Sequence, residues 1–453
     1  MLNTNEKYNV EIVDMGHAGE GIGKVDGMAV FINGVIIGDK VEIVIDQVKK
    51  NFALGSLIQI LEPSKNRITP PCSYADKCGG CSLQPMAYEQ QLKLKKKMVT
   101  DSLERIGHLA DPKVRNTMGM KDPLGYRNKA QYPVTSTGIG FYKIKSHEVV
   151  DCHQCIIQTA AADLAAEVLR SYIKSDNLTC YDEKTGEGLL RHLVVKTAFN
   201  TGQVMVILVI NGRKIPNRDK FIDMMLKGVP GLKSIVINVN TRQTPVVMGT
   251  ECITIHGPAK IVDTLEGLKF EISPLSFYQI NPVQMKRLYN MVVEYAGLRG
   301  EEVIFDLYSG VGTIGLYCAG KAKMVYGIES EKAAVLDAVR NAIINNIVNV
   351  DFIHGKAEIE LPKLIEKDIK PDVVILDPPR NGCDPRLLAT VAEIGPARIV
   401  YVSCNPATLA RDIKILGELG YEFVEAQPVD MFPHTMHVEA VALLTKQTAA
   451  RIV

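Results

Sequence analysis

The sequence predicts a multi-domain α/β protein with an N-terminal OB-like β-barrel, a β-rich central domain and a C-terminal Rossmann-like sheet of seven strands. Short apolar runs alternate with glycine turns at the start of the chain, strand-like segments fill its middle, and strands alternate with helices after Pro282. At 453 residues the chain exceeds one ordinary domain, so we expect three, over residues 1–62, 63–275 and 276–453.

The composition is that of a globular chain. Its 46% apolar and 23% charged residues can bury a full core and exclude bulk disorder, and its net charge of +1 does not by itself suggest a polyanionic partner. The longest unbroken apolar run, Val204 to Ile210, has 7 residues, whereas a membrane span needs about 20. The N-terminus lacks a signal-peptide pattern. We therefore expect a cytoplasmic protein with no membrane partner and with its ten cysteines reduced.

Residues 1–62 carry the period-two pattern of a small β-barrel, a domain class that often, though not always, binds nucleic acid. A cysteine-rich turn segment follows, and an amphipathic helix is predicted over 88–109. The apolar face of this helix comprises Leu92, Val99, Leu103 and Ile106. Its lysines are interpreted mainly as a solvated face; they are Lys93, Lys95, Lys96 and Lys97.

Strand-like segments such as HLVVKTAF and QVMVILVI dominate residues 123–275, with one helix predicted around Thr159–Ile173. From Pro282 onward, strands alternate with helices, which indicates a parallel, doubly wound sheet. The strands are predicted at 302–307, 324–329, 350–354, 372–376, 398–403, 422–427 and 437–444. Only a turn separates the last two, so they should pair antiparallel. Seven strands with a closing hairpin fit a methyltransferase sheet better than a six-stranded dinucleotide-binding sheet.

A glycine-rich loop follows the first strand of this sheet, in VIFDLYSGVGTIGLYCA. Gly310, Gly312 and Gly315 fit the G-x-G-x-x-G pattern, which on its own is compatible with a nicotinamide cofactor. Asp306 lies at the end of the strand before the loop, and Glu329 ends the next strand, where its carboxylate can accept both hydroxyls of a ribose. These two carboxylates favour S-adenosylmethionine over NAD.

The fourth strand ends in ILDPPRNG, a stiff loop at the sheet edge where ligands bind in open α/β folds. Asp-Pro-Pro loops occur in methyltransferases that act on planar nitrogens of bases. Methylation of an exocyclic nitrogen is therefore the alternative enzymatic interpretation. A non-catalytic RNA-binding protein with this fold is a second alternative.

A cysteine follows the fifth strand, in IVYVSCNPATLARD. Because Asn405 is a plausible N-cap and Pro406 a first helical residue, Cys404 should lie at a helix N-terminus, which favours its thiolate. A thiolate can add to carbon 6 of uracil and make carbon 5 reactive toward a methyl donor. The proton on carbon 5 must then be removed by a base. Glu439, which begins the last strand in HTMHVEAVALL, is the candidate.

The motifs FDLYSGVGTIGL, ILDPPRNG, YVSCNPATLARD and HTMHVE closely resemble those of the RNA (uracil-5-)-methyltransferases. Essentially the whole chain is similar to the 23S rRNA (uracil-5-)-methyltransferases, which join a TRAM barrel, an iron–sulfur segment and a β-rich domain to the catalytic domain. The tRNA-modifying branch typically lacks the barrel and the cluster cysteines. The resemblance implies S-adenosylmethionine-dependent methylation of carbon 5 of a uridine in 23S rRNA. We expect a monomer without an obligate protein partner.

The resemblance also implies roles for individual residues, with Cys404 as the nucleophile and Glu439 as the base. The implied cofactor contacts are Gln279, Tyr308, Glu329 and Asp377, and we add Asp306, Gly310 and Gly312 of the glycine-rich segment. Asp377 should also lie close to the uracil. In this family the helix after the cysteine segment packs on the catalytic domain, so we expect helix 88–109 to do so here.

Cys72, Cys78 and Cys81 form a compact trio, and the pair Cys152 and Cys155 begins 71 residues beyond it. A zinc ribbon normally spaces its pairs by about 15–20 residues, so four thiolates around a [4Fe–4S] cluster fit better. The resemblance assigns Cys155 as the fourth ligand and leaves Cys152 over. The remaining cysteines outside the active site are expected in the core; they are Cys180, Cys252, Cys318 and Cys383.

Basic residues of the central domain are candidate RNA contacts, namely Arg127, Lys129 and Arg191, with Tyr126 and Phe141 available for base stacking. A target base must leave its stack to reach Cys404. The sequence therefore implies base flipping.

Overall fold

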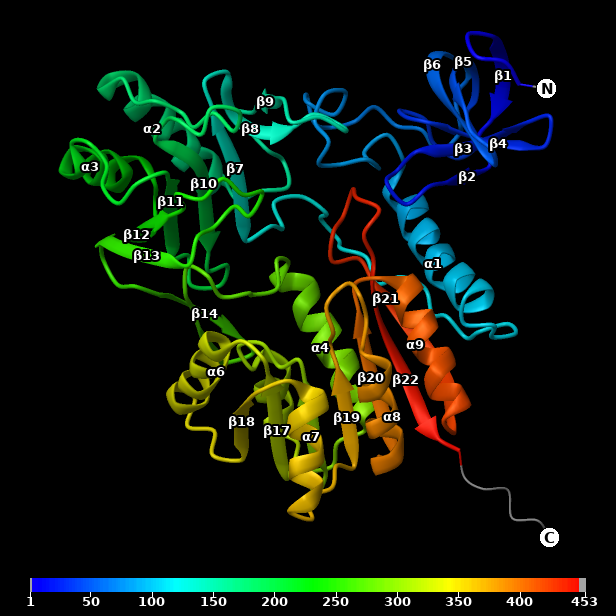
Figure 1. Cartoon of the computed structure of the whole chain (residues 1–453), viewed down its shortest axis with the longest axis vertical. Helices are drawn as coiled ribbons and strands as arrows, with labels where there is room; N and C mark the ends of the chain where they lie inside the picture. Colours follow the sequence, from blue (N-terminus) through cyan, green and yellow to red (C-terminus); the bar gives the residue numbers. More distant parts are fainter. Residues whose placement is uncertain (1, 448–453) are drawn as a thin grey trace.

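The computed structural model describes residues 2–447 and contains three large β-sheets (Figure 1). The N-terminal sheet comprises β1 (Lys7–Glu11), β2 (Asp14–Met15), β3 (Gly21–Val25), β4 (Met28–Ile32), β5 (Lys40–Val48) and β6 (Phe52–Glu62), in the order β1-β5-β6-β4-β3-β2. Because β1 also lies against β3, the sheet curls into the predicted barrel. Within the described residues, no helix is long and apolar enough to cross a bilayer.

The helix after the cysteine-rich segment, α1 (Tyr88–Arg105), is shorter than predicted and packs on the C-terminal domain. Val99 and Leu103 are fully buried there, whereas Ile106 lies beyond the helix and is 40% exposed. The prediction of a solvated lysine face is wrong for Lys95, which has no exposed surface. Its ammonium group can be buried because it pairs with the carboxylate of Asp430.

The central sheet contains β7 (Lys129–Thr135), β8 (Gly138–Tyr142), β9 (Val149–Asp151), β10 (Leu190–Thr197), β11 (Val204–Ile210), β12 (Leu232–Val239) and β13 (Glu251–His256), in the order β13-β12-β11-β10-β7-β8-β9. Two helices share its core, α2 (Ala160–Asp176) and α3 (Arg218–Gly228), where the sequence predicted one. The short α3 buries only Phe221 and Met225, and its 11 residues are a short window in which to recognise a helical period.

The C-terminal sheet confirms the predicted topology. Its elements are α4 (Pro282–Ala296), β16 (Val303–Leu307), α5 (Thr313–Ala319), β17 (Met324–Glu329), α6 (Lys332–Ile344), β18 (Val350–His354), α7 (Ala357–Glu366), β19 (Val373–Leu376), α8 (Pro385–Ile394), β20 (Arg398–Ser403), α9 (Pro406–Glu418), β21 (Tyr421–Val429) and β22 (Glu439–Lys446). The strand order is β18-β17-β16-β19-β20-β22-β21. The first five strands are parallel, and β22 pairs antiparallel with both β20 and β21.

Segments from the first 275 residues complete this C-terminal unit. Val114 and Met118 form single β-bridges to β21, which covers the outer edge of that strand. The hairpin of β14 (Ile261–Leu265) and β15 (Leu268–Ile272) shares the hydrophobic core of the C-terminal sheet. The unit that holds the site is therefore discontinuous in sequence.

Candidate active site

The carboxyl ends of four neighbouring parallel strands meet at one edge of the C-terminal sheet. Tyr308 follows β16, Glu329 ends β17, Asp377 follows β19 and Cys404 follows β20. Because β22 runs antiparallel to β20, its first residue, Glu439, lies at the same edge. All five residues line one cavity of about 650 Å³. This edge is where ligands bind in open α/β sheets.

The glycine-rich loop contributes to the cavity in two different ways. Gly310 lines it at a φ of 56°, and a Cβ there would meet nothing within 4 Å, so its backbone faces open space. Gly312 is not part of the cavity wall. At its φ of 80°, a Cβ would lie 2.6 Å from the ring of Phe352. Of the two predicted contacts, Gly310 can therefore touch a ligand, and Gly312 allows close packing against the neighbouring strand.

Asp306 lies fully buried at the floor of the same cavity, which Gln279 also lines. One oxygen of Asp306 accepts the N–H of Gly315 at 2.9 Å, and the other has no hydrogen-bond partner among the described residues. Burial, reinforced by the charge of Asp377, raises the pKa of Asp306 to about 8. A buried carboxyl oxygen without a partner is suited to an amine or hydroxyl of a ligand.

Tyr308 and Glu329 fix the shape of the loop. Tyr308 has a φ of 67°, a left-handed conformation that non-glycine residues rarely adopt and that is often found at functional sites. One oxygen of Glu329 accepts the N–H of Gly310 at 3.0 Å, and the other accepts the N–H of Glu331 at 2.8 Å. The Glu329 carboxylate thus connects the loop to the end of β17 beside the cavity.

These features fit an aminoacyl nucleoside such as S-adenosylmethionine. The unpaired oxygen of Asp306 and the buried, unpaired hydroxyl of Ser309 are available to a polar ligand. Gly310 leaves room for a close approach, and Glu329 offers a carboxylate on the neighbouring strand. Of this set, Asp306, Gly310 and Glu329 were among the predicted cofactor contacts, and Ser309 was not.

The turn that carries Cys404 is tied to the Asp-Pro-Pro loop. Asn405 caps α9 as predicted, since its side-chain oxygen accepts the N–H of Ala407 at 3.1 Å, and Pro406 begins the helix. The side-chain nitrogen of Asn405 donates to the carbonyl oxygen of Arg380 at 3.0 Å. This bond holds Cys404 and Asp377 on adjacent walls of one cavity.

The thiol and the carboxyls of the cavity interact electrostatically. Burial, followed by the charges of Glu439 and Asp377, raises the pKa of Cys404. The sequence predicts that the helix N-terminus favours the thiolate, and in the free enzyme burial and two acidic neighbours act against that effect. Burial and Asp377 raise the pKa of Glu439 to about 8, and burial raises that of Asp377 to about 7. The cavity thus combines a candidate nucleophile with candidate proton acceptors.

The cavity wall also contains side chains that were not among the predicted site residues, and these include Phe277, Arg380, Phe432 and His437. Arg380 and His437 lie inside the motifs ILDPPRNG and HTMHVE, so their proximity to motif residues was an available signal. Phe277 is 70% exposed, although it is aromatic. Exposure of a large aromatic side chain beside a cavity indicates a surface that meets a ligand or partner.

A second cavity, of about 440 Å³, contains all five cysteines of the two predicted groups. Burial raises the pKa of the Cys81 thiol to about 11 and that of Cys152 to about 12, and the neighbouring thiols add to both shifts. Cys152, expected to be left over, therefore lies with the other four. Over residues 2–447, no three potential ligands already adopt a metal-binding arrangement. Among the other cysteines, Cys318 and Cys383 are buried, and Cys180 and Cys252 are half-buried.

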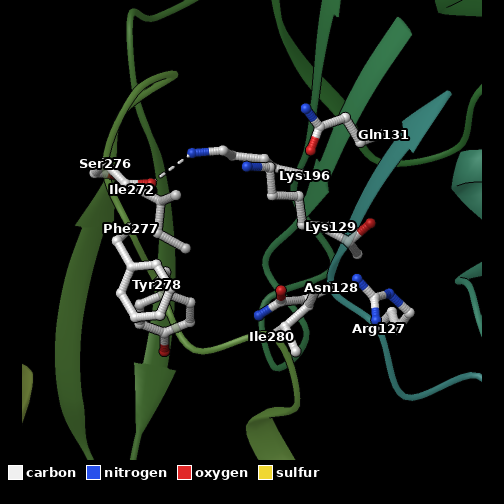
Figure 2. Close-up of a pocket in the computed structure, with 11 residues that line it drawn as sticks. Arg127, Asn128, Lys129, Gln131, Lys196, Ile272, Ser276, Phe277, Tyr278 and Ile280 are labelled. Atoms are coloured by element: carbon white, nitrogen blue, oxygen red, sulfur yellow. Dashed lines mark hydrogen bonds between the residues drawn. The ribbon is translucent and has the colours of Figure 1, made fainter. Parts of the chain in front are cut away.

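A third cavity, of about 170 Å³, is basic (Figure 2). Arg127, Lys129 and Lys196 line it, and no carboxylate does. Lys196 donates to the carbonyl oxygens of Ser273 and Ser276, each at 2.8 Å. Burial lowers the pKa of Lys196 to about 7 and also lowers that of Lys129. This cavity adjoins the catalytic one, because both include residues of the segment 277–280.

Arg191, also predicted to contact RNA, has a different environment. It is 5% exposed, and its guanidinium donates to the carbonyl oxygens of Asn240 and Arg242 at 2.8 and 2.7 Å. The same group lies 4.1 Å from the ring centre of Tyr181. Through these contacts Arg191 links separate segments of the central domain. We therefore do not retain it as a candidate RNA contact.

Comparison with known protein families gives matches at both ends of the chain. The tRNA (Uracil-5-)-methyltransferase family model matches residues 266–447, and the TRAM domain model matches residues 2–58. An uncharacterised RNA methyltransferase of Caldanaerobacter subterraneus subsp. tengcongensis is 50% identical over 97% of this chain and 98% of its own length. Another, from Clostridium tetani, is 47% identical over 97% of this chain and 96% of its own length.

The chain is also similar to a solved structure, that of the Pyrococcus abyssi tRNA (uracil-54, C5)-methyltransferase in complex with S-adenosyl-L-homocysteine. The two are 31% identical with a TM-score of 0.78, over 97% of this chain and 100% of the other. Because a tRNA enzyme matches nearly the whole chain, the N-terminal barrel does not separate ribosomal from tRNA enzymes, and that part of the sequence argument is wrong. The fold, the site and these likenesses together show that the chain is an S-adenosylmethionine-dependent RNA methyltransferase and belongs to the RNA (uracil-5-)-methyltransferase family.

Proposed function

We propose that this enzyme methylates carbon 5 of a specific uridine in 23S rRNA through a covalent bond between Cys404 and the uracil. The observation that carries this proposal is that Cys404, Glu439 and the cofactor loop line a single cavity. A nitrogen methyltransferase would need neither a thiol nor a base for a ring proton. The presence of both beside the cofactor loop favours carbon 5 as the methylated atom.

In the proposed mechanism, the sulfur of Cys404 attacks carbon 6 of the uracil, and the electron pair of the C5=C6 bond moves toward carbon 5 and the adjacent carbonyl. S-Adenosylmethionine, when bound, supplies an electrophilic methyl group that carbon 5 accepts. Glu439 then removes the proton from carbon 5. The C5=C6 bond re-forms, the C6–S bond breaks, and Cys404 leaves as a thiolate.

The electrostatics of the cavity require both groups to lose a proton before they can take part in these steps. Both Cys404 and Glu439 have a raised pKa, so in the free enzyme near neutral pH they largely retain their protons. Arg380 lowers the pKa of Cys404 and so favours its charged form. We propose that the substrate completes the activation of the thiol, with Asp377 close to the uracil.

The test uses RNA that contains 5-fluorouridine, because fluorine cannot leave carbon 5 as a cation. The wild type, given S-adenosylmethionine, should form an adduct that survives denaturing electrophoresis, and Cys404→Ala should form none. Absence of an adduct in the wild type would count against the carbon-5 mechanism. Methylation of ordinary RNA that persists in Cys404→Ala would support the exocyclic-nitrogen alternative. RNA binding without consumption of S-adenosylmethionine would support the non-catalytic one.

The choice of 23S rRNA rests on the resemblance of the cysteine-rich segment to that of the ribosomal enzymes, because the N-terminal barrel does not separate the two groups. Adduct formation is compared on two 5-fluorouridine transcripts, one of 23S rRNA and one of tRNA. We expect the ribosomal transcript to react at one position. Adducts on the tRNA transcript alone would reassign the substrate. We propose that the enzyme is a monomer and that it acts in the cytoplasm.

We also propose that Cys72, Cys78, Cys81 and Cys155 hold a [4Fe–4S] cluster. The support is that the four thiols share one cavity, and thiolates are the usual ligands of such clusters. Protein purified without oxygen should be brown and contain about four irons per chain. Cys155→Ala should lose the colour, whereas the matched Cys318→Ala, in the buried core, should keep it. A colourless wild type with bound zinc would contradict the cluster.

We retain Arg127 and Lys129 as proposed RNA contacts. Both line the basic cavity beside the active site, where no carboxylate neutralises them (Figure 2). Phosphate groups next to a flipped uridine are the expected ligands of such cations.

A further inference from the structure

The loop between β21 and β22, residues 430–438, forms one wall of the catalytic cavity. It contributes Phe432 and His437 to that wall and leads directly into Glu439. In Figure 1 this loop, coloured red, rises from the sheet toward the blue and cyan segments of the first half of the chain. Glu439 pairs with Val429 across the β-hairpin that this loop closes, so the loop acts together with the sheet to position the Glu439 side chain.

Five successive carbonyl oxygens of this loop each accept a hydrogen bond from a group outside it. The donors are Gln284 to Asp430, Asn281 to Met431, Lys95 to Phe432, Tyr126 to Pro433, and the backbone N–H of Leu83 to His434. Buried carbonyls are almost always paired, but usually within regular secondary structure. Here the donors come from segments distant in sequence, so those segments determine the conformation of the loop.

Lys95 of α1 makes the strongest of these contacts. Its ammonium group pairs with the carboxylate of Asp430 and donates to the carbonyl oxygen of Phe432 at 2.9 Å. Both charged side chains have no exposed surface, and Asp430 also accepts the hydroxyl of Tyr88 at 2.7 Å. A buried ion pair adds little net stability, because desolvation offsets the attraction. The contacts of Lys95 instead fix the position of α1 relative to Asp430 and Phe432, at the start of the loop.

Gln91, one turn before Lys95, holds the next part of the loop. Its side-chain oxygen accepts the N–H of His434 at 3.0 Å, and its nitrogen donates to the carbonyl oxygens of Leu83 and Met86 at 3.0 and 2.8 Å. His434 has a φ of 67°. A non-glycine residue in this conformation persists only where its surroundings enforce it.

We propose that Lys95 is a positioning residue for the removal of the carbon-5 proton: it fixes the loop 430–438 and thereby holds Glu439 against carbon 5 of the bound uracil. The inference rests on the proposed function. In this step the Glu439 carboxylate takes the proton, the C5–H electron pair forms the C5=C6 bond, and the C6–S bond breaks to return the Cys404 thiolate. Displacement of Glu439 slows this step but not the earlier addition of sulfur, because the Glu439 charge disfavours the Cys404 thiolate and its removal does not.

The test measures the covalent intermediate on ordinary uridine RNA with the full-length Lys95→Met protein. Because a misplaced general base can cost about tenfold to a hundredfold, release from the adduct in a single turnover should slow by at least about tenfold. The adduct should accumulate at steady state, as it should in Glu439→Gln. Adduct formation on 5-fluorouridine RNA, which does not need the base, should stay within about threefold of wild type.

A matched pair of tyrosine variants separates positioning from general stability. Tyr126→Phe removes a buried hydroxyl that donates to the carbonyl oxygen of Pro433 in the loop at 3.1 Å. Tyr421→Phe removes a buried hydroxyl that donates to the carbonyl oxygen of Pro396 at 2.8 Å, at the opposite end of β21. We expect adduct accumulation in Tyr126→Phe and none in Tyr421→Phe. If Lys95→Met does not fold, this pair decides the question.

Wild-type release rates in folded Lys95→Met and Tyr126→Phe proteins would overturn the inference. Equal slowing in Tyr421→Phe would also overturn it, because the effect would then follow stability instead of the loop. The wild type is first tested on 5-fluorouridine RNA. Absence of an adduct there refutes the proposed function itself, and that result is distinct from either outcome of the variants.

Discussion

At the scale of single residues, three acidic side chains determine how the active site responds to pH. Asp306, Asp377 and Glu439 all have a raised pKa, and burial is the main cause in each. At neutral pH Asp306 and Glu439 largely keep their protons in the free enzyme and Asp377 keeps its proton in part, which lowers the negative charge of a cavity that must admit RNA. Because the pKa values of Asp306 and Glu439 coincide near 8, variants are needed to separate their effects.

Release from the covalent adduct should become faster as pH rises. Glu439 can accept the carbon-5 proton only as a carboxylate, and its pKa is about 8. Single-turnover release should therefore increase about tenfold per pH unit below that value and level off above it. Glu439→Gln should lose both release and its pH dependence. A rate that falls as pH rises would contradict this assignment.

Asp306→Asn should stabilise the free protein at high pH while weakening cofactor binding. Because the folded-state pKa of Asp306 is about 8 and the unfolded value is near 4, the folded state holds an extra proton between these values. Stability contributed by this group is therefore lost as pH rises through that window. The variant should gain on the order of 5 kcal/mol near pH 9, since the two pKa values differ by about four units and one unit corresponds to about 1.4 kcal/mol. Denaturant titrations at low and high pH, with and without S-adenosylmethionine, measure both effects.

Motif residues were predictable because each follows a strand whose end the apolar pattern fixes. Cys404, Glu329 and Glu439 are of this kind, and the structure gathers them in one cavity. The environments of Lys95 and Arg191 were not predictable. Lys95 pairs with a carboxylate 335 residues away, and Arg191 donates to carbonyl oxygens of a loop. Single-sequence periodicity contains no information on such distant partners.

At the scale of elements, the order and direction of the strands in the C-terminal sheet were predictable, but the irregular segments that pack on its edge were not. Alternation of strands and helices implies parallel order, and the antiparallel β22 follows from the short connection after β21. Val114 and Met118, in contrast, contact the edge of β21 through isolated bridges that leave no pattern in the sequence. Tertiary pairing of irregular segments therefore has to be seen in the structure.

The loop between β16 and α5 allows a test with two glycines. Gly310→Ala should change stability by about 1 kcal/mol, the cost of a left-handed alanine, because its Cβ would meet no atom within 4 Å. That Cβ would enter the cavity, so we expect weaker binding of S-adenosylmethionine. Gly312→Ala adds a 2.6 Å contact with the ring of Phe352 and should cost roughly 2–3 kcal/mol or more.

Thermal unfolding and cofactor titration measure both variants of this glycine pair. The expected result is a loss of cofactor affinity larger than the loss of stability in Gly310→Ala, and a dominant loss of stability in Gly312→Ala. An unstable Gly310→Ala protein with normal affinity would show that this residue packs against the fold instead of facing the ligand.

At the scale of the whole molecule, three cavities with different chemistry adjoin one another. The catalytic and basic cavities share Phe277 and Ile280, and the catalytic and cysteine cavities share His437. Arg127 lines both the basic and the cysteine cavities. A nucleotide chain that enters the active site thus meets the central domain and the cysteine segment within a short distance. This arrangement joins parts of the chain that the sequence could only describe separately.

Lys129→Met should weaken RNA binding without weakening cofactor binding, because Lys129 lines the basic cavity beside the active site and not the catalytic cavity itself. Loss of one phosphate contact should reduce RNA affinity by about tenfold at low salt and lower the slope of log affinity against log salt by about 0.7 for single-stranded RNA. The matched control is Lys227→Met on α3, which removes the same charge from an exposed lysine paired with Asp223 at 2.7 Å. RNA titrations at several salt concentrations should separate the two variants. An equal change in both would mean that overall charge, and not the basic cavity, determines binding.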